Sequence, residues 1–329
     1  MRLSKVNALK VGATLCVLFF IVILAIFPDK YLSVTKDGIT LWAITVLPSL
    51  LPYFFLTALL TKTGVVSKIS KIFSPVTKKL FNLSGISAYA FTMSILSGYP
   101  VGSKIVSDLY LKGLISEGEA KRMSVLCSTS GPLFIIGAVG VGMFNDKASG
   151  FIIYACHVLS SVITALLFRK FGGNELVKNN NFTVKSESDI LYDAVYSSVI
   201  SSLMVGGFVS IFYVLTQILI DFKIVMPFAY LFYPLFTKFK ESGLEVSAGF
   251  VAGLIEFTKG CSLITKLGVN PLTVSLCCFL ITFSGASVLA QSLSFLGKAK
   301  VNAIFFILSK LVSGIIASLL CYFACLIFL

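Results

Sequence analysis

The chain has 329 residues, of which 57% are apolar and only 12% are charged. Soluble domains average roughly 45–50% apolar and about 25% charged residues, so this chain has too few charges to solvate a globule. The composition excludes a soluble enzyme, a disordered protein and a secreted disulfide scaffold, and it predicts a polytopic membrane protein. The 27 Lys and Arg residues exceed the 14 acidic ones. They cluster between apolar runs, which is typical of cytoplasmic loops and not of a nucleic-acid surface.

The residues for metal or redox chemistry are missing from the sequence. Eight cysteines lie in or beside apolar runs without metal-ligand spacing, and His157 is the single histidine. Buried thiols of this kind pack as small hydrophobic groups. We therefore expect no metal and no cofactor.

Residues 1–38 are predicted to be an N-terminal membrane anchor helix followed by an outer loop. The apolar run 11–27 follows Arg2, Lys5 and Lys10, and no small-x-small cleavage site comes after it. The run therefore predicts an uncleaved first span whose N-terminus lies inside.

A first gate-like repeat is predicted over 39–168. Its apolar stretch 86–111 is interrupted at Ser97–Lys104 by two glycines and a proline, and basic loops flank the stretch on both sides. A helix cannot continue through such a sequence, and both ends are expected inside, so we predict a re-entrant helical hairpin. A further span opens with a second break at Cys127–Pro132.

The polar stretch 169–192 is predicted to be a cytoplasmic linker, and 193–329 a second gate-like repeat. Breaks are expected at Glu256–Gly260 and at Phe283–Ser287. Whether 228–236 spans the membrane is left open, because Lys238 and Lys240 follow it on the side expected to be outside.

The two repeats keep nearly one register. Pro75 and Pro234 are 159 residues apart, Ser97 and Glu256 are also 159 apart, and Ser128 and Ser284 are 156 apart. Equivalent spans run in opposite directions, which is the arrangement of inverted repeats in secondary transporters. The fold prediction is an all-α polytopic membrane protein of about seven full transmembrane helices plus two re-entrant helical hairpins in inverted repeats.

Inverted pairing would bring both hairpin tips to the midplane, where half-helix N-termini favour an anion. Lys104 either faces a substrate carboxylate or extends to the cytoplasmic surface. Glu256 either forms an ion pair with Lys259 or binds a coupling cation or proton. We expect packing roles for His157 and Lys310. The candidate substrate-binding residues are Ser97, Gly98, Tyr99, Pro100, Gly102, Ser103, Lys104, Ser128, Thr129, Ser130, Glu256, Thr258, Lys259, Gly260, Ser284 and Gln291.

The motifs around these residues resemble one known family. The segments Ser97–Lys104, Ser128–Gly142, Leu254–Gly260 and Ser284–Ser287 with Gln291 are similar to the sporulation integral membrane protein YlbJ (SpoVV) family. That family carries the nucleoside-recognition gate domain and is related to concentrative nucleoside transporters. The resemblance implies a role in endospore formation, with dipicolinic acid moved from the mother cell across the outer forespore membrane.

The function predicted from the sequence is therefore membrane transport of a small organic anion, with dipicolinate suggested by the resemblance. No enzyme activity is expected, and no G-x-x-x-x-G-K-[ST] loop for ATP occurs. The alternatives are a nucleoside-type solute transporter and a non-transporting sporulation scaffold protein. The expected partners are the anion, the lipid bilayer and a coupling ion, without nucleic acid. The oligomeric state stays open.

Overall fold

The computed structural model describes residues 2–62, 65–173 and 190–329, and within these ranges the chain is helical without strands. The all-α prediction is confirmed. Most of the predicted linker 169–192 lies outside the described residues. Among these described residues, four helices are long and apolar enough to cross a membrane, or up to six if each of two bent pairs forms one span. The count of about seven spans stays a prediction.

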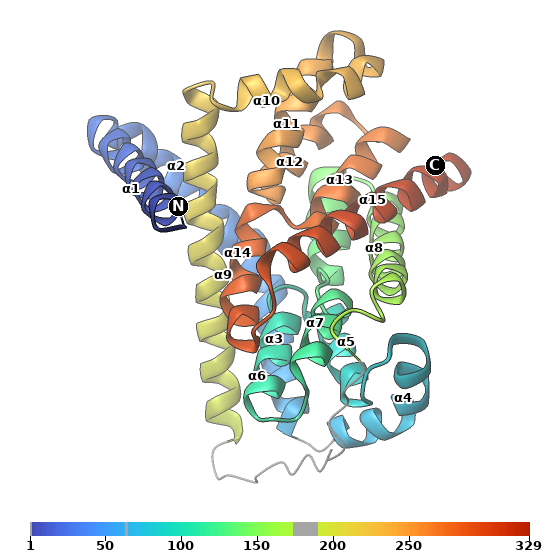
Figure 1. Cartoon of the computed structure of the whole chain (residues 1–329). Helices are drawn as coiled ribbons and strands as arrows, with labels where there is room; N and C mark the ends of the chain where they lie inside the picture. Colours follow the sequence, from blue (N-terminus) through green and yellow to red (C-terminus); the bar gives the residue numbers. More distant parts are fainter. Residues whose placement is uncertain (1, 63–64, 174–189) are drawn as a thin grey trace.

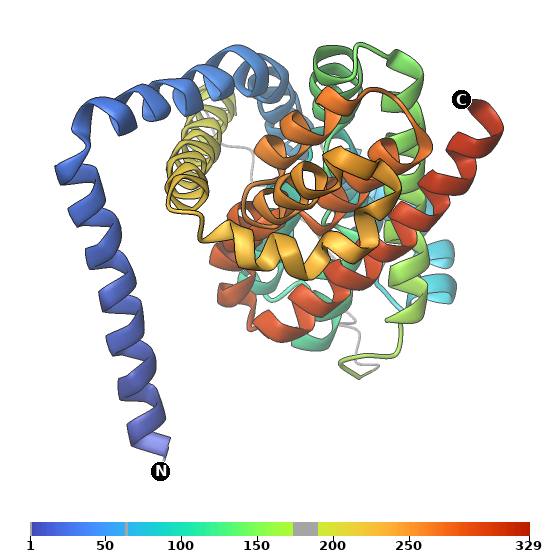
Figure 2. The same cartoon turned by 90° about the horizontal axis from the view of Figure 1, so that it is seen from above.

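The N-terminal helices α1 (Arg2–Ile26) and α2 (Pro28–Leu41) form an arm that leaves the main body (Figure 2). The chain then continues into the bundle as η1 (Trp42–Val46) and α3 (Leu47–Lys62), where Figure 1 labels α3. The helix axis turns by 107° at Phe27, where Pro28 starts α2. Proline suits a first helical turn because its missing N–H has no partner to lose there. Residues 28–38, which we expected to form a loop, are therefore helical.

The first repeat contains a hairpin followed by a broken helix. After η1 and α3, its elements are α4 (Val65–Phe81), α5 (Ile86–Ser97), α6 (Val101–Leu111), α7 (Glu117–Leu126), η2 (Leu133–Met143) and α8 (Lys147–Leu167). The hairpin α5–α6 turns at Gly98–Pro100, and the helix α7–η2 is interrupted at Cys127–Pro132. Both breaks lie at the predicted positions.

The second repeat has the same order. It begins with α9 (Ile190–Asp221), α10 (Val225–Phe232) and η3 (Tyr233–Ser242). Its hairpin is α11 (Gly243–Ile255) and α12 (Phe257–Ile264), which ends in η4 (Thr265–Leu267). The broken helix is α13 (Pro271–Phe283) and α14 (Gly285–Leu296), and η5 (Gly297–Ala299) and α15 (Ala303–Phe328) complete the chain. The breaks fall at Glu256 and Ser284, again as predicted.

The hairpins α5–α6 and α11–α12 enter the bundle from opposite ends (Figure 1), as inverted repeats require. In the chain, α10 comes between the two hairpins. In Figure 1 it lies across one end of the molecule, at an angle to the long helix α9. Residues 225–237 form a short apolar helix that does not qualify as a span. In length and composition, 228–236 therefore differs from the candidate spans.

Glycines let the broken elements approach one another closely. A Cβ on Gly102 in α6 would lie 1.7 Å from the carbonyl oxygen of Cys127. In the second repeat, a Cβ on Gly260 would lie 2.3 Å from the Cα of Gly253 in the partner helix of its hairpin. Each hairpin therefore packs backbone against backbone, which only glycine allows.

Candidate functional site

A cavity of about 40 Å³ lies where both hairpins and both broken helices meet. Gly98 and Tyr99 come from the first hairpin tip, and Phe257 and Thr258 come from the second. Ser130 and Gly131 belong to the break before η2, whereas Val288 and Gln291 belong to α14. Helix α9 closes one side with Val205 and Val209. Val46 and Leu50 complete the lining. All four interrupted elements thus contribute to one partly open cavity, and none of the residues that line it is charged.

The first hairpin tip is held against the broken helix α7–η2 by Ser94. Its hydroxyl donates to the carbonyl oxygen of Cys127 at 2.6 Å and contacts the hydroxyl of Thr129 at 2.7 Å. The backbone N–H of Thr129 in turn donates to the Ser94 oxygen at 3.2 Å. Backbone groups released by the break are satisfied in this way inside the protein. Ser94 was not among the predicted site residues, because nothing in the local sequence distinguishes it from other helical serines.

The second hairpin tip is organised by Glu256, which is fully buried. Its carboxylate accepts the backbone N–H groups of Thr258 at 3.2 Å and of Lys259 at 2.7 Å, so it caps the N-terminus of α12. Among the described residues, no lysine or arginine nitrogen lies within ion-pair distance of this carboxylate. The ion pair with Lys259 that the spacing allowed does not form.

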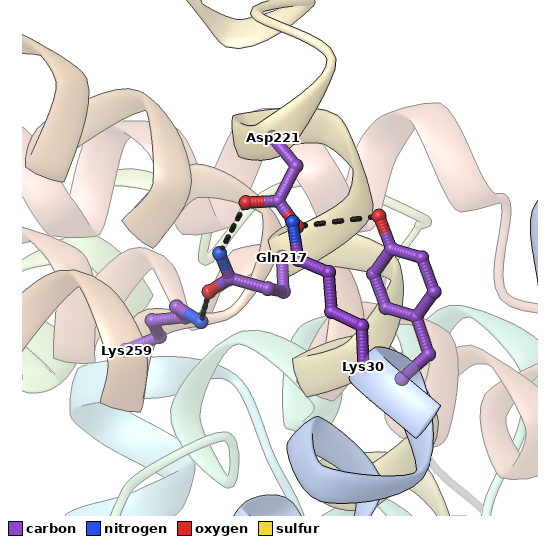
Figure 3. A network of polar contacts seen from close by, with 5 residues as sticks. Lys30, Gln217, Asp221 and Lys259 are labelled. Carbon is purple, nitrogen blue, oxygen red and sulfur yellow. Dashed lines mark hydrogen bonds and ion pairs between the residues drawn. The ribbon is translucent and has the colours of Figure 1, made fainter. Parts of the chain in front are cut away.

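Lys259 instead points to the long helix α9, as Figure 3 shows. Its ammonium donates to the side-chain oxygen of Gln217 and lies 4.1 Å from the ring centre of Tyr213. The Gln217 amide donates to Asp221 at 2.8 Å. Asp221 also accepts from Tyr31 at 3.2 Å and pairs with Lys30 at 2.8 Å (Figure 3). The network joins the second hairpin to α9 and to the N-terminal arm.

Two residues for which we expected packing roles lie at the centre of the polar contacts. Lys310 in α15 is 2% exposed. It donates to the hydroxyl oxygen of Tyr99 at 2.7 Å and to the carbonyl oxygen of Ser128 at 2.9 Å. His157 in α8 accepts the backbone N–H of Ser130 at its Nε2 and contacts the Thr282 hydroxyl through Nδ1, each at 2.8 Å. Because Nε2 accepts, the ring proton is on Nδ1 and the imidazole is neutral.

The predicted candidates separate into three groups. Those that line the cavity are Gly98, Tyr99, Ser130, Thr258 and Gln291. Those buried in the surrounding breaks and hairpins are Ser97, Pro100, Gly102, Ser103, Ser128, Thr129, Glu256, Lys259, Gly260 and Ser284. Lys104 alone is only half-buried; it does not line the cavity, and its electrostatic neighbour is Asp108 one turn later.

Several polar atoms around the cavity are buried without a hydrogen-bond partner. They include the side-chain nitrogen of Gln291 and the hydroxyls of Ser97 and Ser128. An unpaired buried polar group costs about 1–3 kcal/mol, so native proteins rarely keep several together unless something else binds them. Gln291 itself lines the cavity, so its unpaired donor belongs to the cavity wall.

The fold and this site define an integral membrane protein with a transporter fold. The structure resembles CNTnw in an inward-facing substrate-bound state, with a TM-score of 0.58 and 15% identity, over 85% of this chain and 76% of that one. A CNTnw variant in an intermediate state matches with a TM-score of 0.54 and 16% identity, over 95% of this chain and 85% of that one. A variant in an outward-facing state matches with a TM-score of 0.53 and 15% identity.

The amino-acid sequence is similar to that of a sporulation protein. Residues 43–147 match the Gate domain, described as nucleoside recognition. The chain is 29% identical to the "Sporulation integral membrane protein YlbJ" of Bacillus subtilis (strain 168), over 97% of this chain and 83% of that protein. The resemblance inferred from the motifs is thus confirmed. It extends over both repeats, whereas the Gate match covers most of the first repeat.

Proposed function

We propose that this protein transports a small organic anion during endospore formation, and that dipicolinate is its substrate. The direction proposed is from the mother cell across the outer forespore membrane, as the similarity to a sporulation membrane protein suggests. The observation that carries the transport proposal is the single cavity shared by two hairpin tips and two broken helices. Transporter binding sites are typically built from such discontinuous helices near the bilayer midplane.

The chemistry of the cavity wall supports a planar anion. Phe134 and Phe257 stack edge to face at 5.2 Å, and with Tyr99 they give the cavity aromatic surfaces. Ser130, Thr258 and Gln291 add groups that can donate hydrogen bonds, and the lining contains no carboxylate. An anion that leaves water needs its lost hydration replaced by such donors. A flat aromatic dicarboxylate fits both features.

The small volume of the cavity also supports a mechanism with moving hairpins. By the same measure of volume, one water molecule needs roughly 10–15 Å³, so about 40 Å³ holds only a few waters. A six-membered ring with two carboxylates requires more space, and the hairpin tips must separate before it can bind. The same fold occurs in CNTnw structures that face inward and outward, which supports alternating access.

A nucleoside-type solute is the second candidate. It is favoured by the nucleoside-recognition description of the domain that matches 43–147. The base of a nucleoside is also planar and polar, but a nucleoside carries a non-planar sugar and no charge at neutral pH. The two candidates therefore differ in both charge and shape, and uptake measurements can separate them.

The test uses the purified full chain in proteoliposomes with radiolabelled dipicolinate and radiolabelled nucleosides. We expect saturable dipicolinate uptake that falls strongly in Gln291→Leu, since this variant removes the free donor in the cavity. Lys298→Ala, on the exposed turn after α14, serves as the control. If only nucleosides are taken up, the substrate is a nucleoside and not dipicolinate. If neither solute is taken up, the result favours the alternative of a non-transporting scaffold protein.

A deletion strain provides the matching test of the sporulation role. We expect spores with little dipicolinate and mother cells that accumulate it, because synthesis continues while export fails. Complementation with the unchanged chain should restore spore dipicolinate, whereas Gln291→Leu at equal membrane abundance should not. Normal dipicolinate in both compartments of the deletion strain would contradict the proposal.

A further inference from the structure

The buried ammonium of Lys310 lies directly behind the cavity wall. It contacts the hydroxyl oxygen of Tyr99, and Tyr99 lines the cavity. The ammonium also lies 4.8 Å from the centre of the Tyr99 ring. Lys310 itself comes from α15, an element that contributes no residue to the lining. Tyr99 therefore stands between a fixed cation and the space for a solute.

The charge of this lysine is left without a matching anion. Its two hydrogen-bond partners are a phenol oxygen and a peptide carbonyl, and no carboxylate of the described residues lies within ion-pair distance of it. The nearby imidazole of His157 is neutral because Ser130 donates to it. An intramembrane cation is costly, and it is usually retained for function. An anion in the cavity would supply the counter-charge that a protonated Lys310 lacks.

Tyr99 is suited to transmit this charge to a solute. Its oxygen accepts from Lys310 at 2.7 Å. The contacts of its own O–H to backbone carbonyls are long, at 3.4 Å to Ile281 and 3.5 Å to Thr282, and the Ser284 side chain is a further hydrogen-bonding neighbour. A hydroxyl that accepts a charged hydrogen bond becomes a stronger donor, since linked hydrogen bonds polarise one another. A carboxylate oxygen in the cavity offers that proton a better acceptor than either carbonyl.

We propose that Lys310 is the resident counter-cation of the cavity and that, through Tyr99, it makes the cavity select carboxylate solutes over uncharged solutes of the same shape. This inference rests on the proposed function and adds the residue that determines charge selectivity. Lys310 acts through Tyr99 and through its electric field, so it is a positioning and selectivity residue that does not touch the solute. It would explain why a lysine is buried in the last helix.

The test compares dipicolinate with its uncharged diamide, pyridine-2,6-dicarboxamide, by half-saturating concentration for uptake. The wild type should prefer dipicolinate. In Lys310→Met, which keeps the length of the side chain, we expect dipicolinate binding to weaken roughly 50-fold, the effect of a unit charge about 7 Å away at an effective dielectric of about 20. Diamide binding should change little. Lys310→Arg keeps the charge and should keep the preference.

A general packing defect would weaken both solutes equally, and that result would overturn the inference. If Lys310→Met does not reach the membrane, Tyr99→Phe supplies the second test, because it removes the connecting hydroxyl and leaves the lysine in place. This variant should lower the preference for dipicolinate. An unchanged preference would overturn the inference. A wild type that moves both solutes equally well would overturn charge selection alone and leave transport intact. A wild type that moves neither would overturn both proposals.

Discussion

The imidazole of His157 accepts the backbone N–H of Ser130 at 2.8 Å. Through its other nitrogen, the same ring reaches the hydroxyl of Thr282 at 2.8 Å. Ser130 lies in the break before η2 and Thr282 lies at the end of α13, beside the break at Ser284. One fully buried side chain therefore connects the broken helices of both repeats.

The first prediction concerns this connection. His157→Leu should lower the stability of the protein by about 1–3 kcal/mol, because the Ser130 N–H is then buried without an acceptor. The measurement is thermal unfolding of the purified protein in detergent. His157→Gln can still present an acceptor and should lose less. Equal stability of the two variants would show that the hydrogen bond to Ser130 contributes little.

A second prediction uses the closest backbone approach in the first repeat. Gly102→Ala should strongly reduce uptake, because the added Cβ would lie 1.7 Å from the carbonyl oxygen of Cys127 and force the hairpin away from α7. Gly137→Ala is the matched control, since a Cβ there meets no atom within 4 Å. Uptake and membrane abundance are measured together for both. Similar uptake in the two variants would mean that the hairpin tolerates displacement.

The third prediction separates the structural role of Glu256 from its charge. The carboxylate accepts the Thr258 and Lys259 N–H groups with different oxygens, and Glu256→Gln keeps one of these acceptors, so the variant should still insert and fold. If the carboxylate binds the coupling proton or cation, uptake by this variant should no longer depend on pH or on a cation gradient. Glu256→Ala should in addition lose roughly 1 kcal/mol of helix capping. An unchanged gradient dependence in Glu256→Gln would assign the residue a capping role alone.

The network of Figure 3 provides a fourth prediction. Lys259→Met and Gln217→Leu each remove one partner of the same contact between the second hairpin and α9. Their effects on stability should therefore be non-additive, with a coupling of roughly 0.5–3 kcal/mol in a double-mutant cycle measured by thermal unfolding. Lys298→Ala combined with Gln217→Leu is the control pair. Purely additive effects would mean that the hairpin does not depend on this contact.

The fifth prediction concerns pH at the start of α8. Asp146 caps this helix by accepting the backbone N–H groups of Ala148 and Ser149. Hydrogen bonds from Ser149 hold the pKa of the Asp146 carboxyl below its usual value of 3.8. A lowered folded-state pKa means that the stabilisation is complete at neutral pH and is lost as the pH falls into the acid range below about 4.

Asp146→Ala should therefore lower stability at pH 7 by roughly 1 kcal/mol, and the difference from wild type should shrink near pH 3. Asp146→Asn can still cap the helix and should lose much less at pH 7. Unfolding measured at the two pH values in one detergent checks this. A difference in stability between wild type and Asp146→Ala that does not change with pH would contradict the proposal that the ionised Asp146 carboxylate caps α8.

Much of the fold was predictable because its signals are local. Glycine, proline and hydroxyl residues interrupt the apolar runs at the tips of both hairpins and at the breaks of both broken helices. Such residues disfavour a continuous helix by their own backbone chemistry, whatever surrounds them. The basic loops likewise predicted hairpins that enter from opposite ends, and the structure has them so (Figure 1).

The side-chain partners were not predictable in the same way. The spacing of Glu256 and Lys259 allowed a pair, but the carboxylate turns back to the N–H groups of its own helix and the lysine reaches Gln217 in α9. Capping satisfies backbone donors that are otherwise unpaired, and it takes up the carboxylate oxygens. The competing ion pair is lost for that reason.

The amino-acid sequence by itself determined the class of protein, the helical content and the positions of the breaks, since composition and backbone preferences act residue by residue. Only the tertiary structure decided which polar groups surround the cavity. Lys310 meets Tyr99 across 211 positions of the chain, and His157 meets Thr282 across 125. Contacts over such separations depend on how the two repeats pack together, and no local pattern of residues encodes that packing.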